Sequence, residues 1–141
     1  HEIAHVLAEH SNERLSNEYL VSTVLDMLSG RMRASPEVYA ALGLGAQVGI
    51  LLPYSRKQEE EADLLGLDLM ARAGFDPAAA VSLWQGMAAS DQRGGPELLS
   101  THPADENRIR ALRAQLPDAQ DKYQERLKLG SLPDCRPPSL N

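Results

Sequence analysis

Cysteine and aromatic residues are almost absent from this chain of 141 residues. Cys135 is its single cysteine, so an internal disulfide and a structural zinc site built from several thiolates are both excluded. Aromatic residues make up only 4% of the chain, whereas apolar residues make up 43%. The core must therefore be built from Leu, Val, Ile, Ala and Met, and the length fits one domain or part of one.

Basic residues are also in the minority. The chain has 14 Lys and Arg against 20 Asp and Glu, which gives a net charge of −6 and argues against a nucleic-acid partner. Continuous apolar runs are short, and the run Ile50-Leu51-Leu52 ends at Pro53. No run approaches the roughly 20 residues that span a bilayer. We therefore expect no membrane-spanning helix within these residues.

Apolar residues recur at helical spacing almost throughout, and no segment has a convincing strand pattern. We expect Gly30 to cap the first helix and Pro53 to end the second. The predicted helices cover residues 1–28, 36–52, 55–73, 77–89, 103–116 and 119–129, with a loop at 91–102 and a tail from 130 to 141. The fold class is therefore mainly α.

The first five residues carry the clearest functional signal. They read His1-Glu2-Ile3-Ala4-His5, an H-E-x-x-H pattern. Positions i and i+4 lie on one face of a helix, so the two histidines can bind one Zn²⁺. Glu2 is then placed to act as the general base toward a metal-bound water. A catalytic helix is not expected to begin at its first ligand, so we expect this sequence to be the C-terminal part of a longer catalytic domain.

A third ligand must come from another part of the chain. The zincin pattern that adds a glycine and a third histidine is excluded, because Ala8 and Ser11 occupy those positions. His10 misses the histidine position by one residue, so we expect it to be a solvated helix residue.

The acidic run that ends in Asp63 offers carboxylates instead. Glu59 and Asp63 are four residues apart, so they share a helix face, and burying this pair without a cation would cost several kcal/mol. Asp63 is placed to accept the ring N–H of a ligating histidine. Glu59 is the expected third ligand and Glu61 the alternative, while Glu60 is expected to face solvent.

Four segments in a fixed order resemble metallopeptidase family forty-eight. They are HEIAH, YSRKQEEEADLLG, AGFDP and STHPADENRI, and the resemblance covers about residues 1–113. The resemblance implies a zincin-like (gluzincin) helical metalloprotease domain over residues 1–129, with an upstream helix and a small β-sheet that lie outside this sequence. It also implies one Zn²⁺ per chain.

The same resemblance implies roles for individual residues. The three zinc ligands would be His1, His5 and Glu59, the general base would be Glu2, and Asp63 would orient a ligand. The implied activity is zinc-dependent endoproteolysis of unfolded or misassembled polypeptides. The short connection and the AGFDP turn favour the bacterial envelope branch, which implies protein quality control in the periplasm. Membrane association would then come through residues upstream of His1.

Two further residues near the fourth segment have more than one interpretation. His102 is either a surface residue that caps a helix or, by resemblance, a catalytic residue that acts as a fourth zinc ligand or stabilises the oxyanion. Arg108 matches the family's HPxxxxR arginine, and it either pairs with Asp63 or Glu60 or binds a substrate carbonyl. If His102 closes the zinc site, the chain is instead a chaperone-like assembly module that cleaves little.

Overall fold

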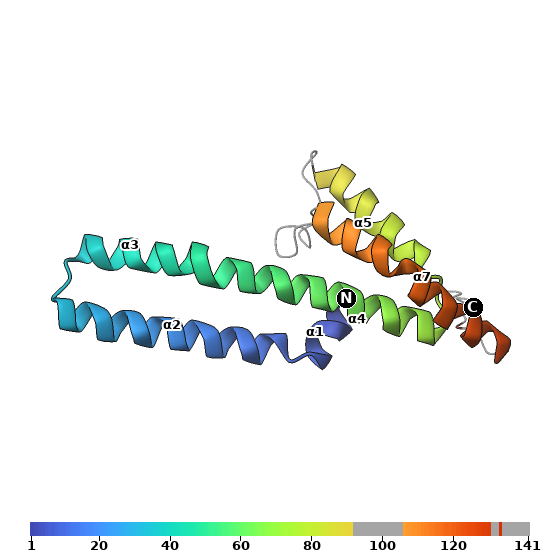
Figure 1. The fold of residues 1–141 in the computed structure, drawn as a ribbon, viewed down its shortest axis with the longest axis horizontal. Helices are drawn as coiled ribbons and strands as arrows, with labels where there is room; N and C mark the ends of the chain where they lie inside the picture. Colours follow the sequence, from blue (N-terminus) through green and yellow to red (C-terminus); the bar gives the residue numbers. More distant parts are fainter. Residues whose placement is uncertain (92–105, 131–132, 134–141) are drawn as a thin grey trace, which may run out of the picture. The chain divides into compact units, whose positions relative to one another are not determined.

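The computed structural model describes residues 1–91, 106–130 and 133, and these residues are almost entirely helical, with no strand among them (Figure 1). The prediction of a mainly α fold is thus confirmed. The elements are α1 (Glu2–Leu7), α2 (His10–Met32), α3 (Pro36–Ala46), the π-helix η1 (Gln47–Leu51), α4 (Leu52–Ala73), α5 (Ala78–Asp91) and α7 (Glu106–Lys128).

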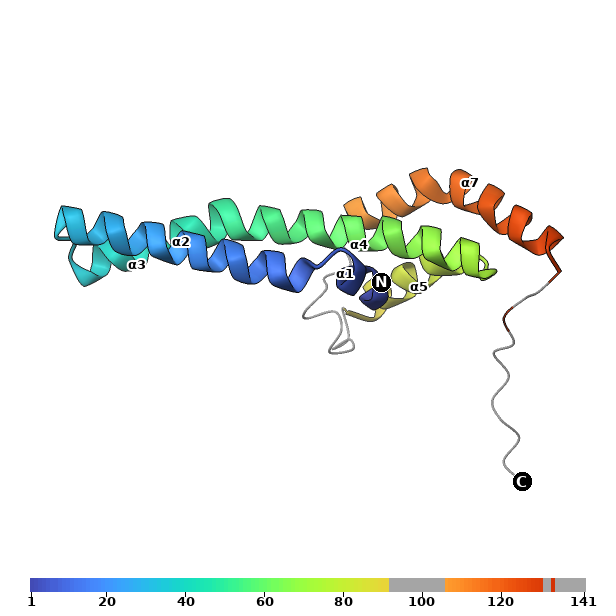
Figure 2. The same ribbon diagram turned by 90° about the horizontal axis from the view of Figure 1, so that it is seen from below.

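The chain divides into two compact units. One comprises Glu2–Ala62, and the other comprises Asp63–Asn141 together with His1. In the first unit, α2 and α3 form an antiparallel hairpin and lie side by side in Figures 1 and 2. The hairpin turns at Arg33, whose φ of 48° is left-handed, while Gly30 lies inside α2. The prediction that Gly30 caps this helix is therefore wrong.

The first predicted helix is interrupted earlier than the sequence suggests. Glu9 has a left-handed φ of 55°, and its N–H donates to the carbonyl of Val6 at 3.2 Å. The helix ends at Leu7 and restarts at His10. Residues 1–28 thus form two helices. The break lies at Glu9, a non-glycine residue whose left-handed conformation is not predicted by its residue type.

The second and third predicted helices are one. Helix runs without a break from Pro36 to Ala73, and it contains an 18-residue window of mean hydropathy 1.3, long and apolar enough to cross a membrane. Pro53 does not end it, because the N–H of Leu52 donates to Gln47, five residues back. This wider π turn accommodates a proline that lacks an N–H. The expectation of no membrane-length segment is wrong, since it considered only uninterrupted apolar runs.

The second unit contains the apolar core. Here α5 packs on α7, and both pack on the C-terminal half of α4. Trp84 is buried in this core, and Met87 packs against it. The buried members are Leu67, Ala71, Val81, Trp84, Leu112 and Ala119.

The AGFDP turn between α4 and α5 follows from the residue types of Gly74 and Asp76. Gly74 has a φ of 90°, and the N–H of Phe75 donates to the carbonyl of Met70 at 3.0 Å. Asp76 caps α5 by accepting the N–H of Ala78 on Oδ1 at 2.9 Å. Glycine is needed at this position because other residues pay a steric penalty at positive φ.

The last two predicted helices are also one, because α7 continues through Pro117. Leu112 and Ala119 lie on either side of the proline and are both buried in the same core. Tertiary packing therefore outweighs the backbone hydrogen bond that the proline removes. The predicted loop at 91–102 and most of the tail at 130–141 lie outside the described residues.

Candidate metal centre

The H-E-x-x-H residues lie on or directly before the short helix α1, in which Ala4 is buried. His1 directly precedes α1, Glu2 occupies its first turn and His5 its last. Ala4 is completely buried and holds α1 in place, whereas Glu2 is exposed to solvent. The histidines are thus partly covered, while the expected base stays accessible to water.

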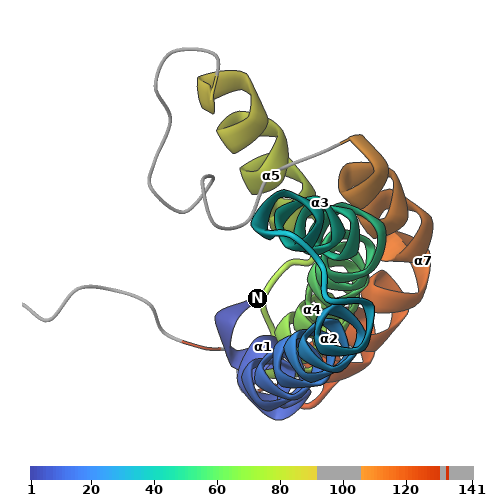
Figure 3. The ribbon, with the colours of Figure 1, turned by 90° about the vertical axis from the view of Figure 1, so that its left-hand side faces the viewer.

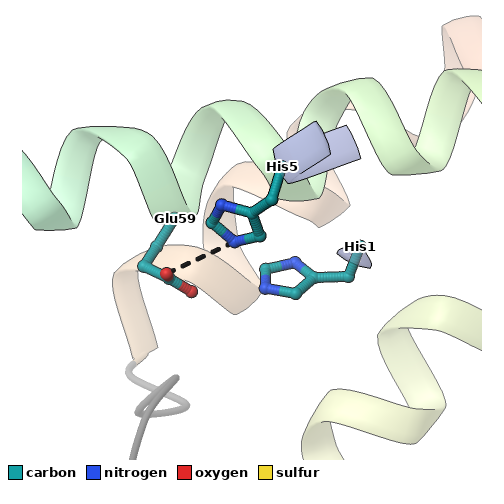
Figure 4. Close-up of side chains that lie close together, drawn as sticks. All are labelled: His1, His5 and Glu59. Atoms are coloured by element: carbon teal, nitrogen blue, oxygen red, sulfur yellow. Dashed lines mark ion pairs between the residues drawn. The ribbon is translucent and has the colours of Figure 1, made fainter. Parts of the chain in front are cut away.

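His5 belongs to a chain of polar contacts within the first unit. Its Nε2 lies 3.4 Å from Oε1 of Glu59, the pair joined by the dashed line in Figure 4. Its Nδ1 lies 2.8 Å from Nδ1 of His10. Nε2 of His10 lies 3.5 Å from Oε2 of Glu61. Carboxylates only accept, so the contacts to Glu61 and Glu59 each favour a proton on the facing Nε2. A cation bound to Nε2 of His5 would take the place of that proton and leave His5 donating through Nδ1 to His10.

His10 is not the solvated residue that the sequence predicts. It is only 2% exposed, and Gln58 donates to its backbone carbonyl at 3.3 Å. The same amide donates to Glu13 at 3.0 Å. The prediction is wrong because it assumed an unbroken helix, in which residues five apart diverge by about 140°. The break at Glu9 brings His10 back to His5.

Asp63 is the centre of a second cluster, within the second unit. It is 4% exposed and forms a bidentate ion pair with Arg108, with contacts of 2.7 and 2.9 Å. Nδ1 of His1 lies 2.8 Å from its Oδ1. Burial would raise the pKa of Asp63, but the hydrogen bonds from His1 and Arg108 outweigh burial and lower it. Asp63 is therefore an anion that fixes the His1 tautomer with its proton on Nδ1.

Trp84 packs against both partners of this aspartate, a contact that the sequence does not indicate. The guanidinium of Arg108 lies 4.3 Å from the centre of the Trp84 ring, and the His1 ring meets the indole edge to face at 5.3 Å. Such contacts restrict the rotation of both side chains. The only signal in the sequence is that Trp84 is the sole tryptophan.

The remaining predicted residues are placed as follows. Glu60 is exposed, and the Glu61 side chain is 66% exposed with its carboxylate toward His10. Of the two partners considered for Arg108, the structure pairs it with Asp63. His102 lies outside the described residues.

The structure also groups one atom from each of three side chains. His1, His5 and Glu59 each offer one ligand atom, and these atoms lie within 4.8 Å of one another (Figure 4). Two imidazole nitrogens and one carboxylate oxygen form a donor set typical of catalytic zinc sites. The buried carboxylate of Glu59 would attract a cation held between it and the histidine nitrogens. The group can therefore hold one divalent cation.

Comparison with known proteins assigns a family. The profile of peptidase family M48 matches residues 1–116. The mitochondrial metalloendopeptidase OMA1 of Schizosaccharomyces pombe is 41% identical over 86% of this chain, and that of Saccharomyces cerevisiae 37% identical over 89%. The beta-barrel assembly-enhancing protease of Yersinia pestis is 32% identical over 77% of the chain. No solved structure matches.

These alignments cover 36%, 37% and 24% of the three relatives, so the chain spans between about a quarter and little more than a third of their length. They also correct one expectation. The predicted bacterial periplasm is wrong, because the more similar relatives are named as mitochondrial proteins of yeasts, animals and a plant. The family expected from the four segments is confirmed: the chain belongs to peptidase family M48.

Proposed function

We propose that this chain supplies the metal site of a zinc-dependent endopeptidase. His1, His5 and Glu59 would bind Zn²⁺, and Glu2 would be the general base. The observation that carries the proposal is the grouping of three ligand atoms within 4.8 Å, all from residue types that zinc prefers. Such a zincin-like arrangement uses three protein ligands and leaves one position for water or substrate.

The tautomers of the two histidines support this assignment. With a metal bound, Asp63 would accept the Nδ1 proton of His1, and His10 would accept that of His5. Both rings would then present an unprotonated Nε2, as a metal ligand must. The buried carboxylates of Glu59 and Asp63, at 5% and 4% exposure, add negative charge that attracts a cation.

The chemistry follows from the positions of the chain's own residues. When bound, zinc acts as a Lewis acid toward a peptide carbonyl and lowers the pKa of water to about 7. Glu2 is exposed at the first turn of α1, where it can take a proton from the attacking water and return it to the leaving amine. Arg108 holds Asp63, and Asp63 in turn orients His1. The substrates would be polypeptide chains.

Two substitutions separate binding from catalysis. We expect Glu2→Gln to retain one zinc per chain, measured by mass spectrometry of the metal, and to abolish cleavage of an unfolded protein such as casein. We expect Glu59→Gln to lose the zinc itself. Glu60→Gln is the matched control, because Glu60 neighbours Glu59 but is exposed. Cleavage retained by Glu2→Gln, or zinc retained by Glu59→Gln, would reject the proposal.

A further inference from the structure

The break between α1 and α2 depends on one strained residue. Glu9 has a left-handed φ of 55°, a conformation that costs a non-glycine residue free energy. Glu9 also stands at the N-terminus of α2 without a side-chain capping hydrogen bond. Strained backbone of this kind persists only where surrounding contacts hold it. The competing arrangement is one unbroken helix, which the spacing of apolar residues favours, so another part of the fold must hold the break.

A contact that can hold it comes from α4. Gln58 is 3% exposed, and its Nε2 donates to the backbone carbonyl of His10 at 3.3 Å and to Oε2 of Glu13 at 3.0 Å. Both acceptors belong to the first turn of α2, directly after the break. Figure 3, which looks along the hairpin, shows α2 beside α4. One side chain therefore ties the start of α2 to the helix that carries Glu59.

The chemistry of the two acceptors fixes the orientation of the Gln58 amide. A carbonyl and a carboxylate only accept hydrogen bonds, so both must face the amide nitrogen, and the opposite orientation would place three acceptors together. Among the described residues, Oε1 of Gln58 is buried without a hydrogen-bond partner. An unpaired buried acceptor costs free energy. The contribution of this side chain therefore lies in the two hydrogen bonds that its nitrogen donates.

The position of His10 decides what supports His5. Nδ1 of His10 lies 2.8 Å from Nδ1 of His5, and the two rings meet edge to face with their centroids 4.9 Å apart. In an unbroken helix the two side chains would point about 140° apart, so this contact requires the break. A histidine binds metal more tightly when a fixed acceptor holds its other ring nitrogen. Gln58 can therefore act on metal binding indirectly, through His10 and then His5.

We propose that Gln58 is a positioning residue of the metal site. Its amide holds the start of α2 in the broken arrangement, and this places His10 behind His5 when a metal binds. The next residue of α4 is Glu59, whose Oε1 lies 3.4 Å from Nε2 of His5. Helix α4 thus supplies one ligand directly and positions a second ligand through the neighbouring amide. This inference rests on the proposed zinc site, because it concerns how tightly that site binds.

Gln58→Met tests the role, since methionine keeps the length of the side chain and removes both donated hydrogen bonds. We expect zinc affinity, measured by competition with a chromophoric chelator, to fall roughly tenfold, at the lower end of the effect of residues that orient a ligating histidine. Gln47→Met is the matched control, because Gln47 is exposed in η1 of the same unit. This control should bind zinc like the parent.

A second substitution separates positioning from a general loss of packing. Glycine pays no steric penalty at positive φ, so Glu9→Gly should keep the break without help from Gln58. We expect Glu9→Gly to restore most of the affinity that Gln58→Met loses, and to leave the affinity of the parent nearly unchanged. Glu18→Gly, at an exposed position inside α2, should restore none of it. Equal recovery by both glycines, or recovery by neither, would contradict the proposal, even if Gln58→Met alone fails to fold.

A readout in the metal-free protein does not depend on zinc. The ring protons of His5 and His10 should show a nuclear Overhauser effect in the parent, lose it in Gln58→Met and regain it when Glu9→Gly is added. An effect that persists in Gln58→Met would overturn the proposal, and so would its loss with unchanged zinc affinity. If the parent bound no zinc, the proposed function would fail, while the same signal would still decide whether Gln58 positions His10.

Discussion

The two units of this chain use apolar residues in opposite ways. In the unit from Asp63 onward, Leu67, Trp84 and Leu112 are buried together in one core. In Glu2–Ala62, the only buried apolar residues described are alanines, and sixteen of the nineteen exposed large hydrophobic side chains of the described residues lie there. Apolar content alone therefore does not locate the core of this protein.

What is buried in the first unit is mainly polar. His10, Gln58 and Glu59 are each no more than 5% exposed and contact one another or their neighbours by hydrogen bonds. One unit is thus held by apolar packing around an ion pair, while the other buries a polar cluster and leaves its hairpin uncovered. The following substitutions test this difference, beginning with the largest expected effect.

Removing the buried arginine should affect stability most. Arg108→Leu leaves Asp63 buried without its bidentate partner, so the free energy of unfolding should fall by about 3–5 kcal/mol. Urea titration followed by Trp84 fluorescence, with chelator present, measures the change. Arg72→Leu is the control, because Arg72 pairs with Asp68 on the surface and should matter little. Equal losses in the two variants would show that Asp63 is not the buried centre of its unit.

Leucines of the two units should differ in the same assay. Leu112 is 1% exposed, so Leu112→Ala should lower the free energy of unfolding by about 2–5 kcal/mol. Leu44 is exposed, and Leu44→Ala should change it by no more than about 0.5 kcal/mol in the absence of lipid. If Leu44→Ala were as destabilising as Leu112→Ala, the hairpin would be covered in solution and the contrast between the units would fail.

The polar cluster of the first unit should act on metal affinity more than on folding. His10→Phe removes the acceptor for the Nδ1 proton of His5, and zinc affinity should fall roughly 10- to 100-fold. Competition with a chromophoric chelator measures this affinity. His10→Gln should recover part of it, because the amide oxygen can accept the same proton. Unchanged affinity in His10→Phe would mean that His10 does not orient His5, without affecting the assignment of the ligands themselves.

The smallest effect is expected at the surface of the second unit. Hydrogen bonds from Arg72 and Lys122 lower the pKa of Asp68. A lowered folded-state pKa contributes stability above the unfolded value of about 3.9, and that stability is lost as pH falls through the folded value. Lys122→Gln should therefore be slightly less stable than the parent at pH 7, and the difference should shrink near pH 3. Lys57→Gln, on an exposed part of α4, should show no such pH dependence.

Much of the local structure follows from residue chemistry in the sequence. The AGFDP turn has its glycine at positive φ and its aspartate as a cap, as those residues predict. The spacing of Glu59 and Asp63 places both on the buried side of α4. These features depend on neighbours within one or two helical turns, and such neighbours are readable from one sequence.

Features that depend on distant packing were not predictable in this way. Pro53 and Pro117 both suggest helix ends, yet a π turn accommodates the first and core packing on both sides accommodates the second. The left-handed Glu9 has no residue signature, and without it the contact of His10 with His5 could not be inferred. The exposure of the hairpin was equally hidden, because its composition matches that of a buried helix.

The π turn at Gln47–Leu51 has a consequence for how this chain can change. A π turn amounts to one residue added to an α-helix, and one residue corresponds to a rotation of about 100°. Loss of a single residue there, such as Gly49, would restore regular winding while leaving both flanking segments intact. Because the wide turn absorbs that extra residue, the apolar arm formed by α3 would keep its angular position relative to the face that bears Glu59, whereas loss of a residue from a regular part of the helix would turn the arm by about 100°.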